Sequence, residues 1–259
     1  MITKLIARGM LVGLLAGLLA AVFAYTTGEP RIDRAIALEE AAAAASQAAG
    51  SHAHETAEAT GHSHETTQAT GHSHDEGEAL VSRDGQRFGL FLALGLYGVA
   101  VGGLFALAYA AVRGRVGPRS EPVLAIALAS AAFTAIVLVP FLKYPANPPA
   151  VGDPETINQR TVLYLVAVAI GLLSVAAGAA THRYAARSEP WLRWLATGAT
   201  VLLPVAAAWI LLPEIDEVPQ GFPADLLWDF RIASLGTQAV FWLGVGALFA
   251  FAARRRSPV

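Results

Sequence analysis

Pairs of histidines separated by one residue recur three times in one stretch of the chain. The stretch reads SHAHETAEAT, GHSHETTQAT and GHSHDEGEAL, a decapeptide repeat over residues 51–80 in which an acidic residue follows each pair. Six of the seven histidines lie here: His52, His54, His62, His64, His72 and His74. Neutral imidazole binds divalent transition metals, and the one-residue spacing lets two rings reach one ion. The repeat predicts metal binding whose affinity rises as the pH passes through about 6.5.

The histidine repeat leaves the identity of the metal open. The chain contains no cysteine, which excludes disulfides, zinc–thiolate sites and iron–sulfur clusters. Affinities at imidazole and carboxylate sites follow one general order, so the residue types alone do not select among Co²⁺, Ni²⁺ and Zn²⁺. The repeat is too polar to form a packed core, so we predict a largely disordered segment. The alternative is a solvated linker with incidental histidines, and the regular recurrence of the pairs favours metal capture instead.

Carboxylates form a second group of candidate metal ligands. They lie in three segments that also contain proline: Glu29 and Asp33; Asp153 and Glu155; Glu214, Asp216 and Glu217. Gathered at one face of a membrane, these side chains would attract cations. The alternative is ordinary loop chemistry, in which each carboxylate caps a helix, closes a turn or pairs with a basic residue, as Asp229 could with Arg231.

Six long apolar segments must position both groups of candidate ligands. They cover approximately residues 9–25, 88–112, 122–142, 161–180, 191–212 and 232–253, and no charged residue lies well inside any of them. A helix of roughly 20 residues crosses a bilayer core. Only 15% of the residues are charged, against about 25% in typical soluble domains. The polar residues at membrane depth are Ser130, Thr134, Ser174, Thr197, Thr200, Ser234, Thr237 and Gln238.

The segments predict an all-α integral membrane protein. We expect a bundle of about six transmembrane helices with a long, histidine-rich, largely disordered outer loop. Residues 1–25 form the first helix, 26–87 the extracytoplasmic loop, and 88–259 a bundle of five further helices. Within the loop, the alanine-rich residues 30–49 are predicted to be helical and to end at Gly50, either lying on the membrane or continuing the first span.

The distribution of basic residues predicts the orientation. Eleven of the 18 lie in the segments that are cytoplasmic if the N-terminus is inside: Lys4, Arg8, Arg113, Arg115, Arg119, Arg183, Arg187, Arg193, Arg254, Arg255 and Arg256. Short cytoplasmic segments of membrane proteins carry such an excess. We therefore predict a multi-pass protein of a bacterial-type inner membrane, with both termini in the cytoplasm.

The first apolar segment admits two interpretations. Its basic start and the residues Val22-Phe23-Ala24 are typical of a cleaved signal peptide. Against cleavage stands the ladder of Gly9, Gly13 and Gly17, which lets a neighbouring helix approach closely.

Four strings resemble the family of predicted cobalt transporter A subunits (CbtA-type). They are EPRIDRAIALE at 29–39, VSRDGQRFGL at 81–90, KYPANPPAVGDPETI at 143–157 and EVPQGFPADLLWDFRIASLGTQ at 217–238, so the resemblance covers most of the chain. The resemblance implies uptake of Co²⁺ for cobalamin synthesis, together with a small single-span companion subunit that bears histidines. It implies no established list of binding residues.

Three functions follow from these observations. The first is a component of a divalent-metal uptake permease, with the histidine loop capturing metal outside. The second is a non-transporting metal sensor or reservoir that feeds another carrier. An enzyme is the third and the least favoured, because no nucleophile–base pair or intramembrane acid is visible. Neither a nucleotide-binding P-loop nor a basic excess is present, so we expect no ATP-driven motor, no tightly bound cofactor and no nucleic-acid partner.

Overall fold

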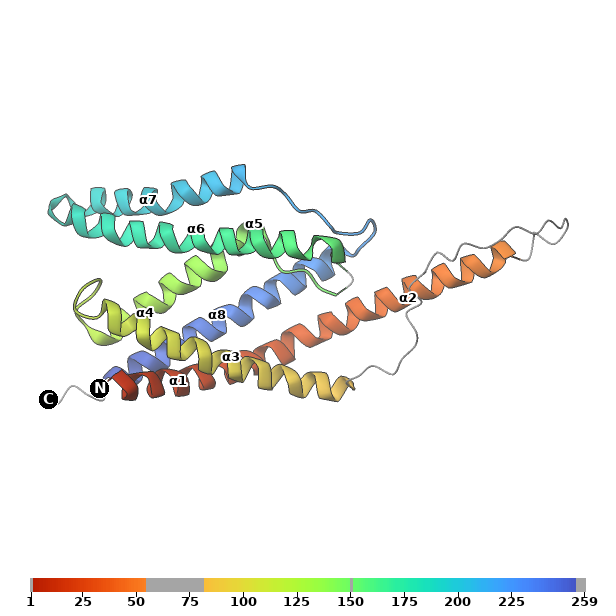
Figure 1. The fold of residues 1–259 in the computed structure, drawn as a ribbon, viewed down its shortest axis with the longest axis horizontal. Coiled ribbons are helices and arrows are strands. Elements are labelled where there is room, and N and C mark those ends of the chain that lie inside the picture. The colour runs from red at the N-terminus through yellow and green to blue at the C-terminus, as the bar shows by residue number, and fades with distance from the viewer. Residues whose placement is uncertain (1, 55–81, 150, 255–259) are drawn as a thin grey trace.

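The structure is a computed structural model that describes residues 2–54, 82–149 and 151–254, with the backbone alone for 46–54. Within these residues six helices are long and apolar enough to cross a membrane, as predicted. The helices are α1 (Ile2–Phe23), α2 (Glu29–His54), α3 (Arg83–Val112), α4 (Glu121–Ala132), α5 (Val139–Lys143), α6 (Ile157–Tyr184), α7 (Pro190–Leu211) and α8 (Ala224–Arg254) (Figure 1). Two π-helical turns, η1 (Ala24–Gly28) and η2 (Phe133–Leu138), join α1 to α2 and α4 to α5.

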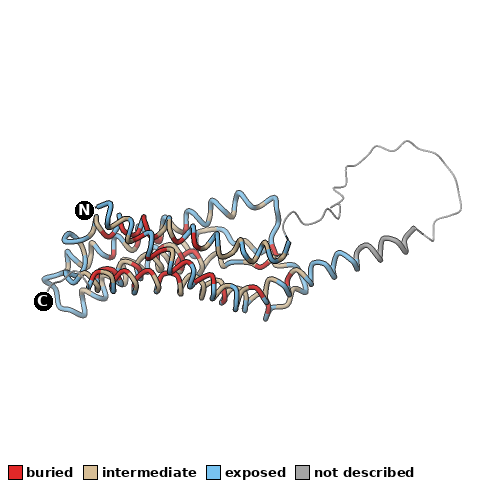
Figure 2. The backbone as a smooth tube through the Cα atoms, turned by 90° about the horizontal axis from the view of Figure 1, so that it is seen from below, coloured by how far each residue is buried: buried red, intermediate tan, exposed pale blue. Residues whose placement is uncertain are grey.

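The helix α2 continues the first span well beyond the bundle. Its 26 residues would extend about 39 Å at the usual helical rise. Ala35 is buried, whereas residues 37–45 are exposed. Figure 2 shows this exposed part of α2 leaving the bundle. The prediction that Gly50 ends this helix was wrong, since α2 runs on to His54. A glycine inside a helix costs only about 1 kcal/mol relative to alanine, so it need not end one.

The closest helix contact in the bundle joins α1 to α3 through glycines. A Cβ atom added to Gly13 would lie 1.9 Å from the carbonyl oxygen of Gly98, and one added to Gly98 would lie 2.2 Å from that of Gly13. Gly9 and Gly102 meet in the same way, with 2.3 and 2.1 Å for the two added Cβ atoms. Helices in lipid associate through such backbone packing, because lipid is as apolar as their side chains. The predicted role of the glycine ladder is confirmed.

Helix α8 carries three of the five largest fully buried side chains, and it packs on α1 and α4. Phe241, Val245 and Phe249 are buried there, together with Tyr109 of α3. Val12, Ala16 and Ala20 of α1 belong to the same cluster. Cleavage after Ala24 would therefore remove one wall of this core.

The helices α6 and α7 pair with each other and form a second layer beside this core (Figure 1). The layers meet at η2, where a Cβ atom on Gly171 of α6 would lie 2.2 Å from the carbonyl oxygen of Ala135. The described chain ends, Ile2 and Arg254, and the connections 113–120 and 185–189 lie at one end of the bundle, which we call the basic end. The α2 end, opposite, carries α2 and the connections 144–156 and 212–223.

Replacing Gly13 by alanine should destabilise the bundle. The added methyl group would collide with the backbone of α3, and overpacking of this kind lowers the free energy of unfolding by about 2 kcal/mol. Gly89→Ala is the matched control, because a Cβ atom there has no neighbour within 4 Å. Thermal unfolding in detergent should show a lower Tm for Gly13→Ala and an equal or higher Tm for Gly89→Ala. Equal Tm values for Gly13→Ala and the unmodified chain would contradict this packing.

Candidate functional site

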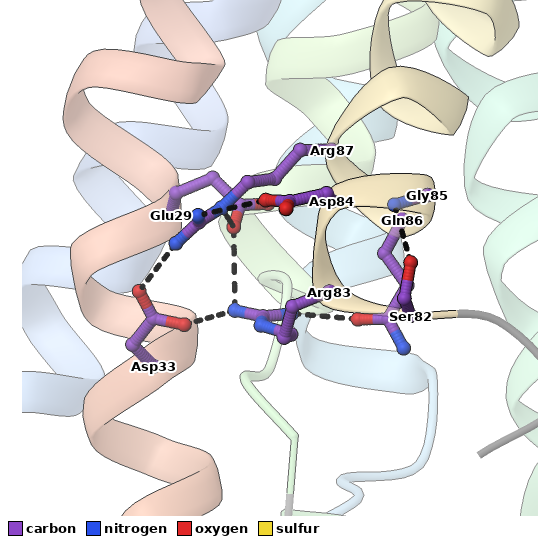
Figure 3. Close-up of polar contacts among 8 residues, drawn as sticks. All are labelled: Glu29, Asp33, Ser82, Arg83, Asp84, Gly85, Gln86 and Arg87. Carbon is purple, nitrogen blue, oxygen red and sulfur yellow. Dashed lines mark hydrogen bonds and ion pairs between the residues drawn. The ribbon is translucent and has the colours of Figure 1, made fainter.

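Two carboxylates and two arginines form an ion-pair network where α2 begins and α3 begins. Glu29 and Asp33 are four residues apart on α2, and Arg83 and Arg87 are four apart on α3, so each pair shares one helix face. Arg83 Nη2 lies 3.3 Å from Glu29 Oε2 and also bonds Asp33, while Arg87 lies 3.8 Å from Glu29 and 3.7 Å from Asp33 (Figure 3). The two predicted ligands Glu29 and Asp33 are thus brought together, but each is held by arginines.

The start of α3 is built to present these arginines. The hydroxyl of Ser82 accepts a hydrogen bond from the Gly85 N–H at 3.2 Å and so caps the helix. Asp84 in the first turn pairs with Arg87 at 3.6 Å. Glu29 is only 8% exposed, and a buried carboxylate of this kind requires compensation by positive charge. The network therefore holds the N-terminal end of α3 against the continuous α1–α2 helix.

Glu217 joins the two connections at the α2 end. Its carboxylate accepts hydrogen bonds from the Thr156 hydroxyl and from the Asp153 N–H at 3.0 Å, and Arg160 lies 3.4 Å away. The hydrogen bond from Thr156 is the main cause that lowers the pKa of the Glu217 carboxyl, with the Asp153 N–H and Arg160 adding to it. Asp153 also caps the turn Pro154–Thr156, accepting from the Glu155 N–H at 2.9 Å.

The remaining predicted carboxylate ligands are Glu214, Asp216 and Glu155. Glu214 pairs with Lys143 at 3.7 Å, and the ammonium of Lys143 lies over the Trp209 ring, 5.4 Å from its centroid. Asp216 accepts from the Val218 N–H at 3.4 Å, and Glu155 is exposed. No group of three or more metal-ligating side chains occurs among the residues that the structure describes.

The histidine repeat falls almost entirely outside the described residues. His62, His64, His72 and His74 lie within 55–81, and for His52 and His54 only the backbone at the end of α2 is described. Metal capture by the repeat stays a prediction from the sequence.

A partly open cavity of about 570 Å³ lies where the two layers meet at the α2 end. Its walls come from α3, η2, α5, α6, α8 and the segment 143–147. Ser234 and Gln238, two of the polar residues expected at membrane depth, line it with Tyr97 and Tyr164. Its described lining contains no sulfur, carboxylate or imidazole group; the polar groups among its apolar side chains are tyrosine, amide, hydroxyl and basic groups.

Basic side chains line the cavity, and only one of them lacks a carboxylate partner. Lys143, Arg160 and Arg231 are lining residues, and none of the described lining residues is acidic. Lys143 and Arg160 pair with Glu214 and Glu217 outside the lining, so the uncompensated charge is that of Arg231. The expected pair of Asp229 with Arg231 is not formed: Asp229 pairs with Arg31 at 3.7 Å, and Arg231 Nη2 donates to Asn147 Oδ1 at 2.9 Å. Sequence reasoning missed this cavity because its lining comes from segments far apart in the chain. The one indication in the sequence was that three basic residues, Lys143, Arg160 and Arg231, lie close to connections that are otherwise acidic.

Comparison with known proteins gives one match. The family model described as "Probable cobalt transporter subunit (CbtA)" matches residues 2–254. No curated protein matches the chain, and no solved structure matches it.

The contribution of Glu217 to stability should depend on pH in one direction. Because folding lowers its pKa, the stabilisation is complete above the ordinary pKa of a glutamate, about 4.3, and is lost as the pH falls through the lower value of the folded protein. The Tm difference between the unmodified chain and Glu217→Gln should be constant from pH 7 to 5 and should shrink below pH 4. Glu155→Gln is the control and should leave the Tm unchanged; a Glu217 difference that grows on acidification would contradict the assignment.

Proposed function

We propose, because this chain belongs to the CbtA family of probable cobalt transporter subunits, that it is a membrane component of a permease that takes up a divalent transition metal. Co²⁺, destined for cobalamin synthesis, is the proposed substrate, and Ni²⁺ and Zn²⁺ are its competitors. The observation that carries the proposal is the family match over residues 2–254, which includes all six helices able to span a membrane.

The histidine repeat is the proposed capture site for metal. Its six histidines, in three H-x-H pairs followed by carboxylates, supply borderline ligands that suit Co²⁺. The carboxylates at the α2 end contribute less to this proposal, since Glu29, Asp33, Glu214 and Glu217 are each paired with basic side chains. Capture would raise the local metal concentration beside the bundle, from which the permease draws.

The basic end supports the proposed orientation. Arg113, Arg115, Arg119, Arg183 and Arg187 lie in or beside the connections at that end, together with the described chain ends Ile2 and Arg254. The excess of basic residues supports a cytoplasmic location for it. On this proposal α2, the histidine repeat and the 570 Å³ cavity all lie on the outer side of the inner membrane.

A companion subunit completes the proposed permease. The family description names a subunit, and the resemblance of the four strings implies a small single-span partner with histidines. No charged residue is present in the central part of the spans, and transport pathways usually hold such residues. A partner would supply the missing ligands along the path.

The alternative function is a metal sensor or reservoir that transports nothing. It is favoured by the described residues, among which no metal-ligating cluster lies at membrane depth. It needs only the histidine repeat, whereas a permease needs the bundle as well. The two functions therefore differ in what survives when the histidines are removed.

Cobalt uptake should distinguish these functions. Metal-starved cells that produce the chain with its companion should accumulate radioactive Co²⁺ saturably, and replacing the six repeat histidines by alanine should raise KM about tenfold with little change in maximal uptake. His182→Ala, which changes the one histidine outside the repeat, is the control. Background uptake with the companion present, together with metal binding by the purified chain, would establish the sensor or reservoir instead.

The orientation can be tested with single cysteines, because the chain has none of its own. Gln220→Cys at the α2 end and Ser188→Cys at the basic end both occupy exposed positions. In intact spheroplasts a membrane-impermeant maleimide should label Gln220→Cys and leave Ser188→Cys unlabelled until the cells are lysed. The reverse pattern of labelling would overturn the proposed orientation.

A further inference from the structure

Arg231 of α8 is a cavity residue whose charge has no counter-ion within salt-bridge distance among the described residues. Its guanidinium donates to the neutral amide of Asn147 at 2.9 Å, and its Nε is buried without a hydrogen-bond partner. Asp216 is near enough to act on Arg231 electrostatically, although the two side chains form no salt bridge. A guanidinium carries five donors, so the hydrogen bond to Asn147 uses only part of the hydrogen-bonding capacity of Arg231.

This arrangement is energetically unusual for an arginine next to a membrane span. Charged groups taken out of water are normally paired, and arginine forms its strongest contacts as a two-pronged donor to a carboxylate or a phosphate. The Asp229 carboxylate, two residues before Arg231, is engaged by Arg31 instead. Arg231 therefore adds positive charge to the cavity wall, and an oxyanion inside the cavity would complement it.

The rest of the cavity fits an anion with more than one carboxylate. Lys143 and Arg160 add two further cationic groups to the lining, and their partners Glu214 and Glu217 are not lining residues. A volume of about 570 Å³ lies within the range of sites for small molecules.

We propose that this cavity binds a small polycarboxylate of the kind that chelates divalent cobalt. Resting on the proposed function, the inference adds that the metal reaches the bundle as an anionic chelate. A bare divalent cation would meet the uncompensated charge of Arg231, two ion-paired basic side chains and no carboxylate in the described lining. A chelate with net negative charge would place its carboxylates on Arg231, while the metal keeps ligands from the chelator.

Binding of radiolabelled citrate to the purified chain in uncharged detergent tests the proposal, with and without Co²⁺. Citrate should bind saturably, and Arg231→Gln should weaken binding about tenfold or more. Arg34→Gln is the matched control, since Arg34 is exposed at the same end and outside the cavity lining. Asn147→Ala removes the neutral partner but keeps the charge, so it should leave binding within about threefold.

The Tm of each variant checks that it is folded. Arg231→Lys keeps the positive charge but loses the two-pronged guanidinium donor, so it should bind citrate with intermediate affinity. Four results would overturn the proposal: no saturable binding, binding unchanged in Arg231→Gln, equal weakening by Arg34→Gln, or full displacement of citrate by phosphatidylglycerol. The last result would assign the cavity to a lipid headgroup.

The two proposals fail in different ways. Cobalt uptake by a chain that binds no citrate would contradict this inference alone. Citrate binding without cobalt uptake would contradict the proposed function and leave the cavity's ligand in place.

Discussion

Backbone contact between glycines is the constraint on which the other contacts of this bundle depend. Helices in lipid gain little from burying apolar side chains, so they must pack closely to associate. Gly9 and Gly13 let α1 reach Gly98 and Gly102 of α3, and this contact sets the continuous α1–α2 helix beside the start of α3. The arginines of α3 then face Glu29 and Asp33. Gly171 similarly brings α6 against η2, and the cavity lies where these layers meet.

The resulting charge distribution differs from the predicted face of carboxylates that would attract cations. The carboxylates of Glu29, Asp33, Glu214 and Glu217 are compensated by arginine or lysine, and these pairs tie separate segments together. A positive charge remains at Arg231, inside the cavity. We therefore propose that the histidine repeat captures the metal and that the bundle supplies a pocket whose charge suits an anion. This division explains how an uptake component can lack charged residues in the central part of its spans.

The sequence predicts the local features of this structure well and the long-range pairings poorly. Apolar length identifies the six spans, and small-residue spacing identifies the packed face of α1, because both depend on neighbouring residues. The partners Arg31–Asp229 and Arg231–Asn147 are separated by 198 and 84 positions, so no local pattern reveals them. The expected pair of Asp229 with Arg231 was wrong for this reason. The extension of α2 past Gly50 was missed because glycine is a weak terminator when its neighbours favour a helix.

Metal flux through the purified protein is the direct test of a role in transport. Proteoliposomes that contain the chain and its companion subunit, with a cobalt-sensitive dye trapped inside, report entry of the metal without contributions from other carriers. The account predicts saturable quenching of the dye when Co²⁺ is added outside, at a rate that falls when the six repeat histidines are replaced and the metal is scarce. Quenching no faster than in empty liposomes, at any metal concentration and with both subunits folded, would contradict a role in transport.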